Sequence, residues 1–369
     1  MEDQYRDFLD LLYDTYNTSD PAYVVSKTVM LCSKETVNEF ASKFIPVFYV
    51  VNFLLSFIGN GLVLLIIFKY EKLVAVTNIF LLSLVFSNLL FASSLPFWAT
   101  YHWSEWIFGT FLCKVVSSAY FIGFYSSILF LTLMTFDRYL AVVHAVAAAK
   151  SRKKLYAIIA SVVVWAISIA ASTKELVLRN VWQHPINGFI CEESGLSDRS
   201  MERWNLVTYY QQFLLFFLLP LIMVMYCYIS ITVRILSTRM KEKCRAIKLI
   251  FVIIFTFFVC WTPFNIVILL RAIQISYSGD EEESCSDKDG LDFAFYVTRN
   301  IAYLYCCISP VFYTFLGKKF QSHFRRLISR KIPCLKRHFP IGSQSTRSTS
   351  QRAPHSANEL TYTQHCPDA

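Results

Sequence analysis

Seven long apolar segments, separated by short polar or charged stretches, set the pattern of the chain. They cover residues 44–68, 78–100, 111–143, 155–172, 206–233, 247–270 and 291–316. Each is about 20 residues or longer, which is the length that an α-helix needs to cross a bilayer. A buried soluble core would account for one or two such runs, and the strands of a membrane β-barrel would be about ten residues long with alternating polarity. The pattern therefore predicts an all-α membrane protein, a seven-transmembrane helix bundle.

The composition agrees with this prediction and excludes other classes. Of 369 residues, 55% are hydrophobic and only 17% are charged, whereas soluble proteins carry about 25% charged residues. The mean hydropathy is +0.43. A soluble enzyme, a disordered protein and a small disulfide scaffold are excluded. We expect four parts: an outer N-terminal segment (1–43), the bundle (44–316), a short amphipathic eighth helix on the membrane surface (317–335) and a disordered cytoplasmic tail (336–369).

Lysine and arginine gather in the loops that follow the first, third, fifth and seventh segments. Because positively charged loops stay in the cytoplasm, the N-terminus is predicted outside and the C-terminus inside, in a multi-pass protein of the plasma membrane. The opposite side is acidic: residues 1–20 hold six Asp or Glu against Arg6, and residues 280–289 hold six against Lys288. The net charge of +9 thus describes the cytoplasmic face. The outer face either attracts a basic partner or is simply solvated.

Four of the eleven cysteines fall in outer segments: Cys32, Cys113, Cys191 and Cys285. An even number of cysteines in an oxidising compartment indicates disulfide pairing, and four cysteines allow three connectivities. Asn17, followed by Thr and Ser, starts the only glycosylation sequon. This sequon lies on the outer side, where a glycan can be attached.

Four short motifs lie in the predicted helices. The third segment ends in Asp-Arg-Tyr-Leu-Ala-Val-Val-His-Ala-Val at 137–146, and the sixth carries Cys-Trp-Thr-Pro at 260–263. The first carries Gly59-Asn60, and the seventh ends in Pro-Val-Phe-Tyr at 310–313. With seven helices and an outer N-terminus, the chain resembles the rhodopsin-like G-protein-coupled receptors. The run at 137–146 and the acidic, tyrosine-containing N-terminus are similar to chemokine receptors, and this resemblance covers about residues 1–335.

Within that family, several stretches look most like the XC-type (lymphotactin) receptor. They are Lys-Tyr-Glu-Lys-Leu at 69–73, Thr-Asn-Ile-Phe at 77–80, Tyr-His-Trp at 101–103 and Ile-Lys-Leu-Ile-Phe at 247–251. Arg299-Asn300 indicates the same, because most CC-type receptors place a Glu there. CC-type receptors stay close, since Gly-Phe-Tyr-Ser-Ser at 123–127 and the His-Ala-Val run look like theirs. The resemblance favours an XC-type receptor, with the CC-type as the alternative.

The resemblance implies the disulfide pairs Cys113–Cys191 and Cys32–Cys285. It implies a receptor, not an enzyme, that binds a small basic chemokine outside and activates a heterotrimeric G protein of the inhibitory class inside. Chemotaxis and calcium signalling would follow. Arrestin, receptor kinases and membrane lipid are the further partners implied, and no cofactor, metal or nucleic acid is expected.

For the ligand, the resemblance implies a site in two parts. In the outer part, sulfated tyrosines and neighbouring aspartates would bind the basic chemokine core: Tyr5, Tyr13, Tyr16, Asp10 and Asp14. In the deeper part, a cavity for the chemokine N-terminus would be lined by Trp98, Tyr120, Tyr296 and Arg299. Arg299 would pair either with an acidic group of the ligand or with one of the receptor, such as Glu192 in the second outer loop.

An activation switch is expected deeper in the bundle. Arg138 is a cation within a membrane helix, and such a group is costly unless paired and is functional by default. Asp137 can hold Arg138 in a resting ion pair. Once released, Arg138 can meet the partial negative charge at the end of a G-protein helix. The alternative is a snorkelling interfacial arginine. Pro263 kinks its helix, so that Trp261 beside the kink can amplify a small push from the ligand. Further switch residues are Tyr139, Tyr228, Pro310 and Tyr313.

Two positions of the core polar network, which also includes Asn60, depart from the family pattern. Asn88 stands where the family has an Asp, and Ser309 stands where it has an Asn before a proline. The lost anion predicts weak or absent regulation by sodium. The change also supports an alternative function, an atypical receptor that takes up chemokine without G-protein signalling, although the intact Asp-Arg-Tyr at 137–139 argues against it.

Beyond the seventh segment, Cys334 follows a basic amphipathic stretch and is a candidate for palmitoylation. The tail holds a hydroxyl cluster suited to kinases, whose phosphates would recruit arrestin: Ser345, Thr346, Ser348 and Thr349. The alternative is low-complexity disorder without a role.

Other classes lack their signatures. An opsin needs a lysine in the seventh segment to bind retinal, and residues 291–316 hold none. A transporter would show internal repeats. An enzyme is disfavoured because the chain has no His-Glu-x-x-His, no P-loop and no Gly-x-Gly-x-x-Gly.

Overall fold

The computed structural model of the chain describes residues 35–71, 75–151, 153–184, 188–237, 241–277, 285–316 and 322–323. The chain divides into two units, Met1–Gln321 and Ser322–Ala369. Of the predicted eighth helix and tail, only residues 322–323 are described. Several predictions lie outside the described residues and concern Tyr5, Asp10, Tyr13, Asp14, Tyr16, Asn17, Cys32, Cys334, Ser345, Thr346, Ser348 and Thr349.

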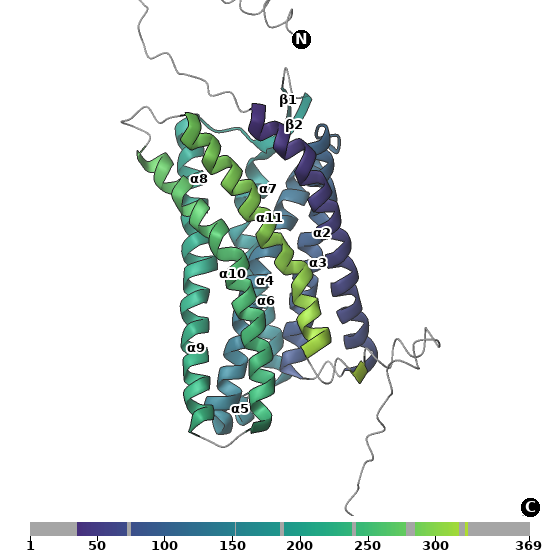
Figure 1. Ribbon diagram of the computed structural model, residues 1–369, viewed down its shortest axis with the longest axis vertical. Coiled ribbons are helices and arrows are strands. Elements are labelled where there is room, and N and C mark those ends of the chain that lie inside the picture. The colour runs from purple at the N-terminus through teal and green to yellow at the C-terminus, as the bar shows by residue number, and fades with distance from the viewer. Residues whose placement is uncertain are drawn as a thin grey trace, which may run out of the picture. The chain divides into compact units, whose positions relative to one another are not determined.

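The first unit is a bundle of long helices with one short β-hairpin at one end (Figure 1). In chain order its elements are α2 (Glu35–Tyr70), α3 (Val76–Trp103), α4 (Gly109–Val143), α5 (Ala145–Ser151), α6 (Lys154–Ala171), α7 (Thr173–Leu178), β1 (Arg179–His184), β2 (Gly188–Glu193), α8 (Asp198–Phe213), the π-helical turn η1 (Leu214–Leu218), α9 (Leu219–Leu236), α10 (Lys241–Tyr277) and α11 (Cys285–Leu316). Among the described residues, six helical stretches are long and apolar enough to cross a membrane. The helix α11 covers the seventh predicted segment, so the predicted fold class is confirmed.

Several helices extend beyond their apolar runs. The fifth predicted segment starts at residue 206, but α8 begins at Asp198, and the sixth starts at 247, but α10 begins at Lys241. A helix needs no apolar surface where its side chains stay in water, so hydrophobicity alone underestimates its length. The turn η1 lies just before Pro220 and includes Phe216, the residue whose carbonyl the proline ring would meet in a regular α-helix. The wider turn accommodates that proline.

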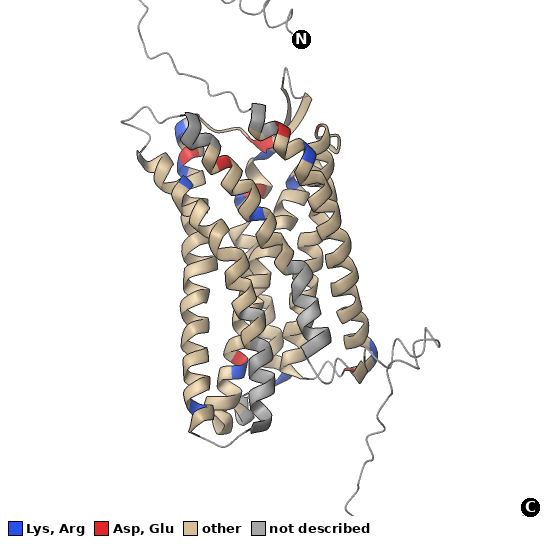
Figure 2. Ribbon diagram, in the orientation of Figure 1, with Lys and Arg blue, Asp and Glu red and all other residues tan. Residues whose placement is uncertain are grey.

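The lipid-facing surface of the bundle is apolar. Among the described residues, the charged residues lie mostly towards the two ends of the bundle, and the middle holds few of them (Figure 2). Large aliphatic side chains are exposed along this middle, such as Ile58, which is 68% exposed, and Val162, which is 61% exposed. In water this surface would be a large unfavourable patch, whereas in a bilayer it contacts lipid tails.

The helix α4 lies at the centre of the bundle, where it contacts α3, α6, α7, α9 and β1. Gly123 permits the close approach of α4 to α3, because a Cβ there would lie 2.6 Å from the backbone nitrogen of Phe91. Polar side chains join the same helices. Ser126 Oγ donates to Ser87 Oγ at 2.8 Å.

A second polar contact joins α3 to α2 within the core. Asn88 Nδ2 donates to Asn60 Oδ1 at 3.2 Å, and Asn60 Nδ2 donates to the carbonyl of Ser56 at 2.9 Å. All three side chains are buried. Two members of the predicted altered network are therefore in direct contact. The third, Ser309, lies in α11, but its side chain is outside the described residues.

Candidate functional site

A disulfide fixes the β-hairpin to the bundle. The strands β1 and β2 pair antiparallel, with Val181 opposite Cys191. Cys191 is bonded to Cys113 near the start of α4, and both sulfur-bearing residues are buried. The predicted pair Cys113–Cys191 is confirmed. Cys285 begins α11, but the pair that it would form with Cys32 lies outside the described residues.

The segment between α3 and α4 holds the other side of the hairpin. Glu105 Oε2 accepts a hydrogen bond from the backbone nitrogen of Phe189 at 2.7 Å. The backbone nitrogen of Trp106 donates to the carbonyl of Phe189 at 2.8 Å. The indole of Trp106 is only 1% exposed and donates to the carbonyl of Gly109 at 2.9 Å. The hairpin is therefore tied to two points of the bundle and forms a fixed rim.

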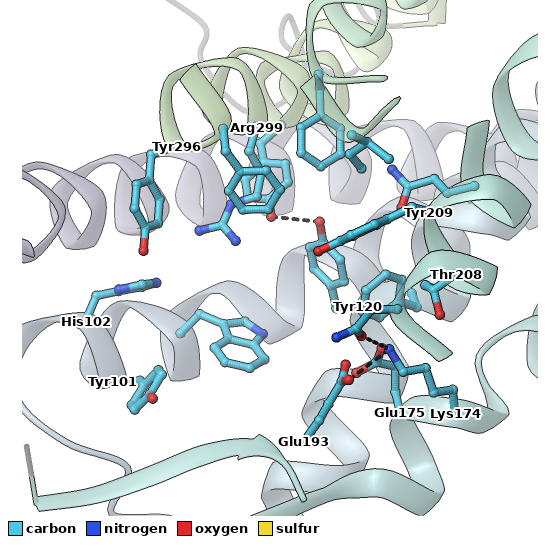
Figure 3. Close-up of a pocket in the computed structure, with 18 of the residues that line it drawn as sticks. Tyr101, His102, Tyr120, Lys174, Glu175, Glu193, Thr208, Tyr209, Tyr296 and Arg299 are labelled. Atoms are coloured by element: carbon cyan, nitrogen blue, oxygen red, sulfur yellow. Dashed lines mark hydrogen bonds and ion pairs between the residues drawn. The ribbon is translucent and has the colours of Figure 1, made fainter. Parts of the chain in front are cut away.

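A cavity of about 250 Å³ opens between the helices next to this hairpin (Figure 3). Its walls come from α2, α3, α4, α7, β2, α8, α10 and α11. The four side chains predicted to line a deep cavity all line this one: Trp98, Tyr120, Tyr296 and Arg299. Segments far apart in the sequence thus contribute to one space. Sequence reasoning missed several other lining residues, among them Tyr49, Tyr101, His102, Lys174, Glu175, Glu193 and Tyr209.

Aromatic rings form much of the cavity wall on the side of α11. Tyr303 donates its hydroxyl hydrogen to the hydroxyl oxygen of Tyr120 at 2.8 Å, which links α11 to α4. The ring of Tyr303 also lies 5.6 Å from that of Tyr49, and the rings of His102 and Tyr296 lie 6.2 Å apart. These spacings are those of packed aromatic pairs. The wall is therefore apolar on its faces, with hydroxyl groups at fixed points.

Arg299 brings a positive charge into this aromatic surrounding. Figure 3 shows its side chain reaching from α11 into the space among the labelled Tyr296, His102 and Tyr120. The guanidinium carbon lies 5.0 Å from the ring centre of Phe295 and 5.3 Å from that of Tyr296, within the range of cation–π contacts. Its Nε and Nη2 atoms are buried and make no hydrogen bond with any described residue. The ring contacts offset only part of the cost of burying this charge.

Four charged side chains form a network on the opposite side of the cavity. Lys174 Nζ lies 2.8 Å from Glu193 and donates to Asn205 Oδ1 at 2.6 Å. Arg179 Nε lies 2.7 Å from Glu175, and Arg179 Nη2 lies 3.6 Å from Glu193. Two cations and two carboxylates make this network neutral by itself, and it joins α7, β1, β2 and α8.

The guanidinium of Arg179 stays charged in this place. Burial would lower its pKa, but the carboxylates of Glu175 and Glu193 outweigh that effect, and the pKa lies above its ordinary value. Glu193, and not the neighbouring Glu192 named from the sequence, lines the cavity, and a role of Glu192 in chemokine binding stays a prediction. Side chains alternate along a strand. Cys191 and Glu193 lie on the same face of β2, and Glu192 between them is exposed.

Trp261 lies one aromatic ring away from the cavity. Its ring centre is 6.0 Å from that of Phe264, which lines the cavity, and its ring stacks on Phe124 of α4 at 4.4 Å. Trp261 is 1% exposed, and Pro263 lies two residues on within α10. A displaced Phe264 would therefore press directly on the Trp261 ring.

The residues of the Asp-Arg-Tyr run lie at the end of α4 that is remote from the hairpin. Asp137 is 1% exposed, and its Oδ2 accepts a hydrogen bond from Thr77 at 3.3 Å. Tyr139 shares a hydrogen bond of 3.0 Å with His144 and packs its ring 5.8 Å from that of Tyr226. Arg138 is partly buried, and its predicted ion pair with Asp137 stays a prediction.

Three further predicted switch residues belong to the same end. Tyr228 in α9 is 8% exposed and packs its ring edge-on against Phe251 of α10 at 5.4 Å. Pro310 and Tyr313 lie in α11, but their side chains are outside the described residues. Among the described residues, the predicted cavity residues and the predicted switch residues are thus separate groups, and Trp261 lies nearer to the cavity residues.

Comparison with known proteins gives two findings. The sequence profile of the family described as "7 transmembrane receptor (rhodopsin family)" matches residues 59–313. The chain is 36% identical over 330 residues to the C-C chemokine receptor type 3 of Cavia porcellus, covering 89% of this chain and 90% of that protein. It is also 36% identical over 302 residues to the C-C chemokine receptor type 1 of Homo sapiens, covering 82% and 84%.

Proposed function

Because this chain belongs to the rhodopsin family of seven-transmembrane receptors and, within it, to the chemokine receptors, we propose how it receives and passes on its signal. The hairpin end of the bundle faces the outside of the cell. A small basic chemokine binds there and places its N-terminal segment in the cavity next to the hairpin. The opposite end then activates a heterotrimeric G protein of the inhibitory class, which drives chemotaxis and calcium signalling.

The observation that carries this proposal is the convergence of four predicted ligand residues on one cavity. Trp98, Tyr120, Tyr296 and Arg299 come from three helices and line the same space of about 250 Å³. The hairpin rim is fixed by a disulfide and by backbone contacts, so the shape of the entrance is set before a ligand arrives. A preformed entrance lowers the entropic cost of binding.

The route of the signal is supported by ring contacts. A ligand segment in the cavity touches Phe264, and Phe264 touches Trp261 next to Pro263. We propose that this ring moves and shifts the far half of α10, which frees Arg138 for the G protein. The aromatic contact of Tyr228 with Phe251 joins α9 to α10 there and would have to rearrange.

The outer N-terminal segment supplies the first contact. Its six acidic residues among the first 20 favour a basic ligand by long-range attraction. Sulfation of Tyr5, Tyr13 and Tyr16 would add to that charge. On the cytoplasmic side, we propose that the basic residues after α11 lie on lipid, and that phosphates on the tail bring in arrestin through receptor kinases.

The class of chemokine is the finer question. The two relatives named above are C-C chemokine receptors, so a C-C chemokine is the first ligand to test. The preference for an XC-type ligand stays a prediction that rests on Arg299-Asn300 and on the stretches at 69–73 and 101–103. A scavenging receptor without G-protein signalling remains the alternative, because Asn88 replaces the usual acid.

Binding of labelled chemokines to intact cells tests the proposed ligand site. Cells expressing the full chain should bind at least one C-C or XC-type chemokine, and the variant Trp98→Ala should weaken that binding. The matched control Trp165→Ala changes a half-buried tryptophan of α6 that packs on Phe130 and does not line the cavity, and it should leave binding unchanged. Equal loss in both variants, or no binding to any chemokine of these classes, would contradict the proposal.

A further inference from the structure

Arg299 holds an unfilled hydrogen-bonding edge in the cavity. Nε and Nη2 are the two nitrogens on the side of a guanidinium, and their hydrogens point in the same direction. Both atoms are buried, and neither makes a hydrogen bond with a described residue. Two parallel N–H donors are the geometry that holds the two oxygens of a carboxylate at once.

The carboxylates that line the cavity are already engaged. Glu193 is held by Lys174 at 2.8 Å, and Glu175 is held by Arg179 at 2.7 Å. Asp292, the next acid along α11, is paired with Arg271. Among the described residues, no carboxylate forms an ion pair with Arg299, so no salt bridge within that part of the chain compensates its positive charge.

The surroundings of Arg299 select among anions. Rings of Phe295 and Tyr296 lie beside the guanidinium, and Tyr49 adds a third ring at 6.0 Å. Such walls favour a flat, partly apolar group over a fully hydrated ion. A volume of about 250 Å³ holds an acidic side chain with a neighbouring residue, or a small aromatic acid.

We propose that the cavity is a carboxylate-binding subsite, in which the Nε–Nη2 edge of Arg299 takes a carboxylate group in a bidentate pair while the aromatic rings cover its apolar neighbour. This deepens the proposed function. One source of the carboxylate is an acidic side chain in the N-terminal segment of the chemokine. The other source is a free organic acid with an aromatic ring.

Three probes of the same shape test the subsite directly: indoleacetate, its neutral analogue indoleacetamide, and the cationic analogue tryptamine. The full chain is purified in lipid nanodiscs, and the midpoint of thermal unfolding is measured with each probe. Indoleacetate should raise the midpoint, and the other two probes should not, because only the carboxylate offers two acceptors to the fork.

Variants then locate the effect. Arg299→Gln should abolish the rise in the midpoint, and Arg299→Lys should reduce it, because a lysine keeps the charge but not the fork. The matched control is Arg203→Gln, which removes an exposed arginine of α8 that does not line the cavity. That control should keep the response to indoleacetate.

The source of the carboxylate is found with a chemokine that activates the wild-type chain. Converting the acids of its N-terminal segment to amides should weaken its potency about tenfold to a hundredfold, the loss expected for a hydrogen-bonded charge pair. The amidated and the unmodified chemokine should have the same potency on the Arg299→Gln variant of the receptor. If amidation has no effect on the wild type while indoleacetate binds, the free organic acid is the source.

Two results would overturn the subsite: equal stabilisation by all three probes, or an unchanged response of Arg299→Gln to indoleacetate. A failure of the proposed function looks different. In that case no chemokine activates or binds the chain, whereas indoleacetate still stabilises the wild type and not Arg299→Gln.

Discussion

Replacing Glu175 with glutamine should destabilise the end of the bundle that carries the hairpin. The carboxylate of Glu175 is 2.7 Å from Arg179, and the residue is only 2% exposed. The amide keeps the size and one acceptor but removes the charge. Arg179 then keeps Glu193 at 3.6 Å as its remaining carboxylate partner within the described chain.

The distances give the size of the effect. At an effective dielectric constant of about 20, charges 2.7 Å apart attract by roughly 6 kcal/mol and charges 3.6 Å apart by roughly 5 kcal/mol. The glutamine regains part of this lost attraction, because its neutral amide costs less free energy to bury than a carboxylate. We expect a decrease of about 3 kcal/mol in the free energy of unfolding, the lower end for a broken buried pair.

The assay follows thermal unfolding of the purified chain in nanodiscs by labelling of buried thiols, such as that of Cys227. Glu175→Gln should lower the midpoint by several degrees. The control Glu39→Gln breaks the pair of Glu39 with Lys43, which is as short, at 2.6 Å, but exposed, and it should leave the midpoint unchanged.

A double variant separates the pair from other effects of the substitution. Glu175→Gln combined with Arg179→Gln should be less destabilising than the two single changes added together. Because the folded-state pKa of Arg179 is raised, its share of the stability is lost only when the pH rises through that pKa. The effect should therefore be the same at about pH 6 and about pH 9, below the range in which arginine titrates. Additive single effects, or a midpoint equal to that of the Glu39 control, would refute this reasoning.

Three further predictions concern other contacts. Cys113→Ser removes a disulfide that joins positions 78 residues apart. It should lower the free energy of unfolding by about 4–5 kcal/mol and abolish chemokine binding to cells. Full chemokine binding without the disulfide would contradict a fixed rim. Tyr303→Phe removes the 2.8 Å hydrogen bond to Tyr120 and should cost about 1 kcal/mol in the unfolding assay, whereas an unchanged midpoint would show that this bond adds nothing. Agonist affinity of the wild type should not depend on sodium, because Asn88 carries no charge that would attract the ion. Asn88→Asp should make the affinity depend on sodium, and sodium dependence in the wild type would refute the prediction.

The fold was predictable from the sequence because every span is a continuous apolar run. Hydrophobicity places the membrane-embedded part of each helix, but it carries no signal for the polar extensions that begin at Asp198 and Lys241. The turn η1 left only the weak signal of Pro220 within the fifth segment. The short hairpin was missed because its strands are six residues each, and because a disulfide and neighbouring loops hold them in place.

The site was predictable where the family pattern names a residue and not where tertiary contacts decide. Glu192 and Glu193 are adjacent and chemically equal, and only the strand register set by Cys191 shows which one faces the cavity. Lys174 and Glu175 did leave a signal, since charges directly after an apolar span, close to Arg179, indicate a salt-bridge network. Their mutual distances depend on how the chain turns back and could not be derived.

The most direct test of the account is to record chemokine uptake and G-protein dissociation together in cells that express this chain. The C-C and XC-type chemokines that bind the cells are applied one at a time. We predict that uptake of the effective chemokine is accompanied by dissociation of an inhibitory-class G protein, and that Trp261→Ala blocks dissociation while surface binding persists. Uptake without dissociation in the wild type would contradict it and identify a scavenging receptor.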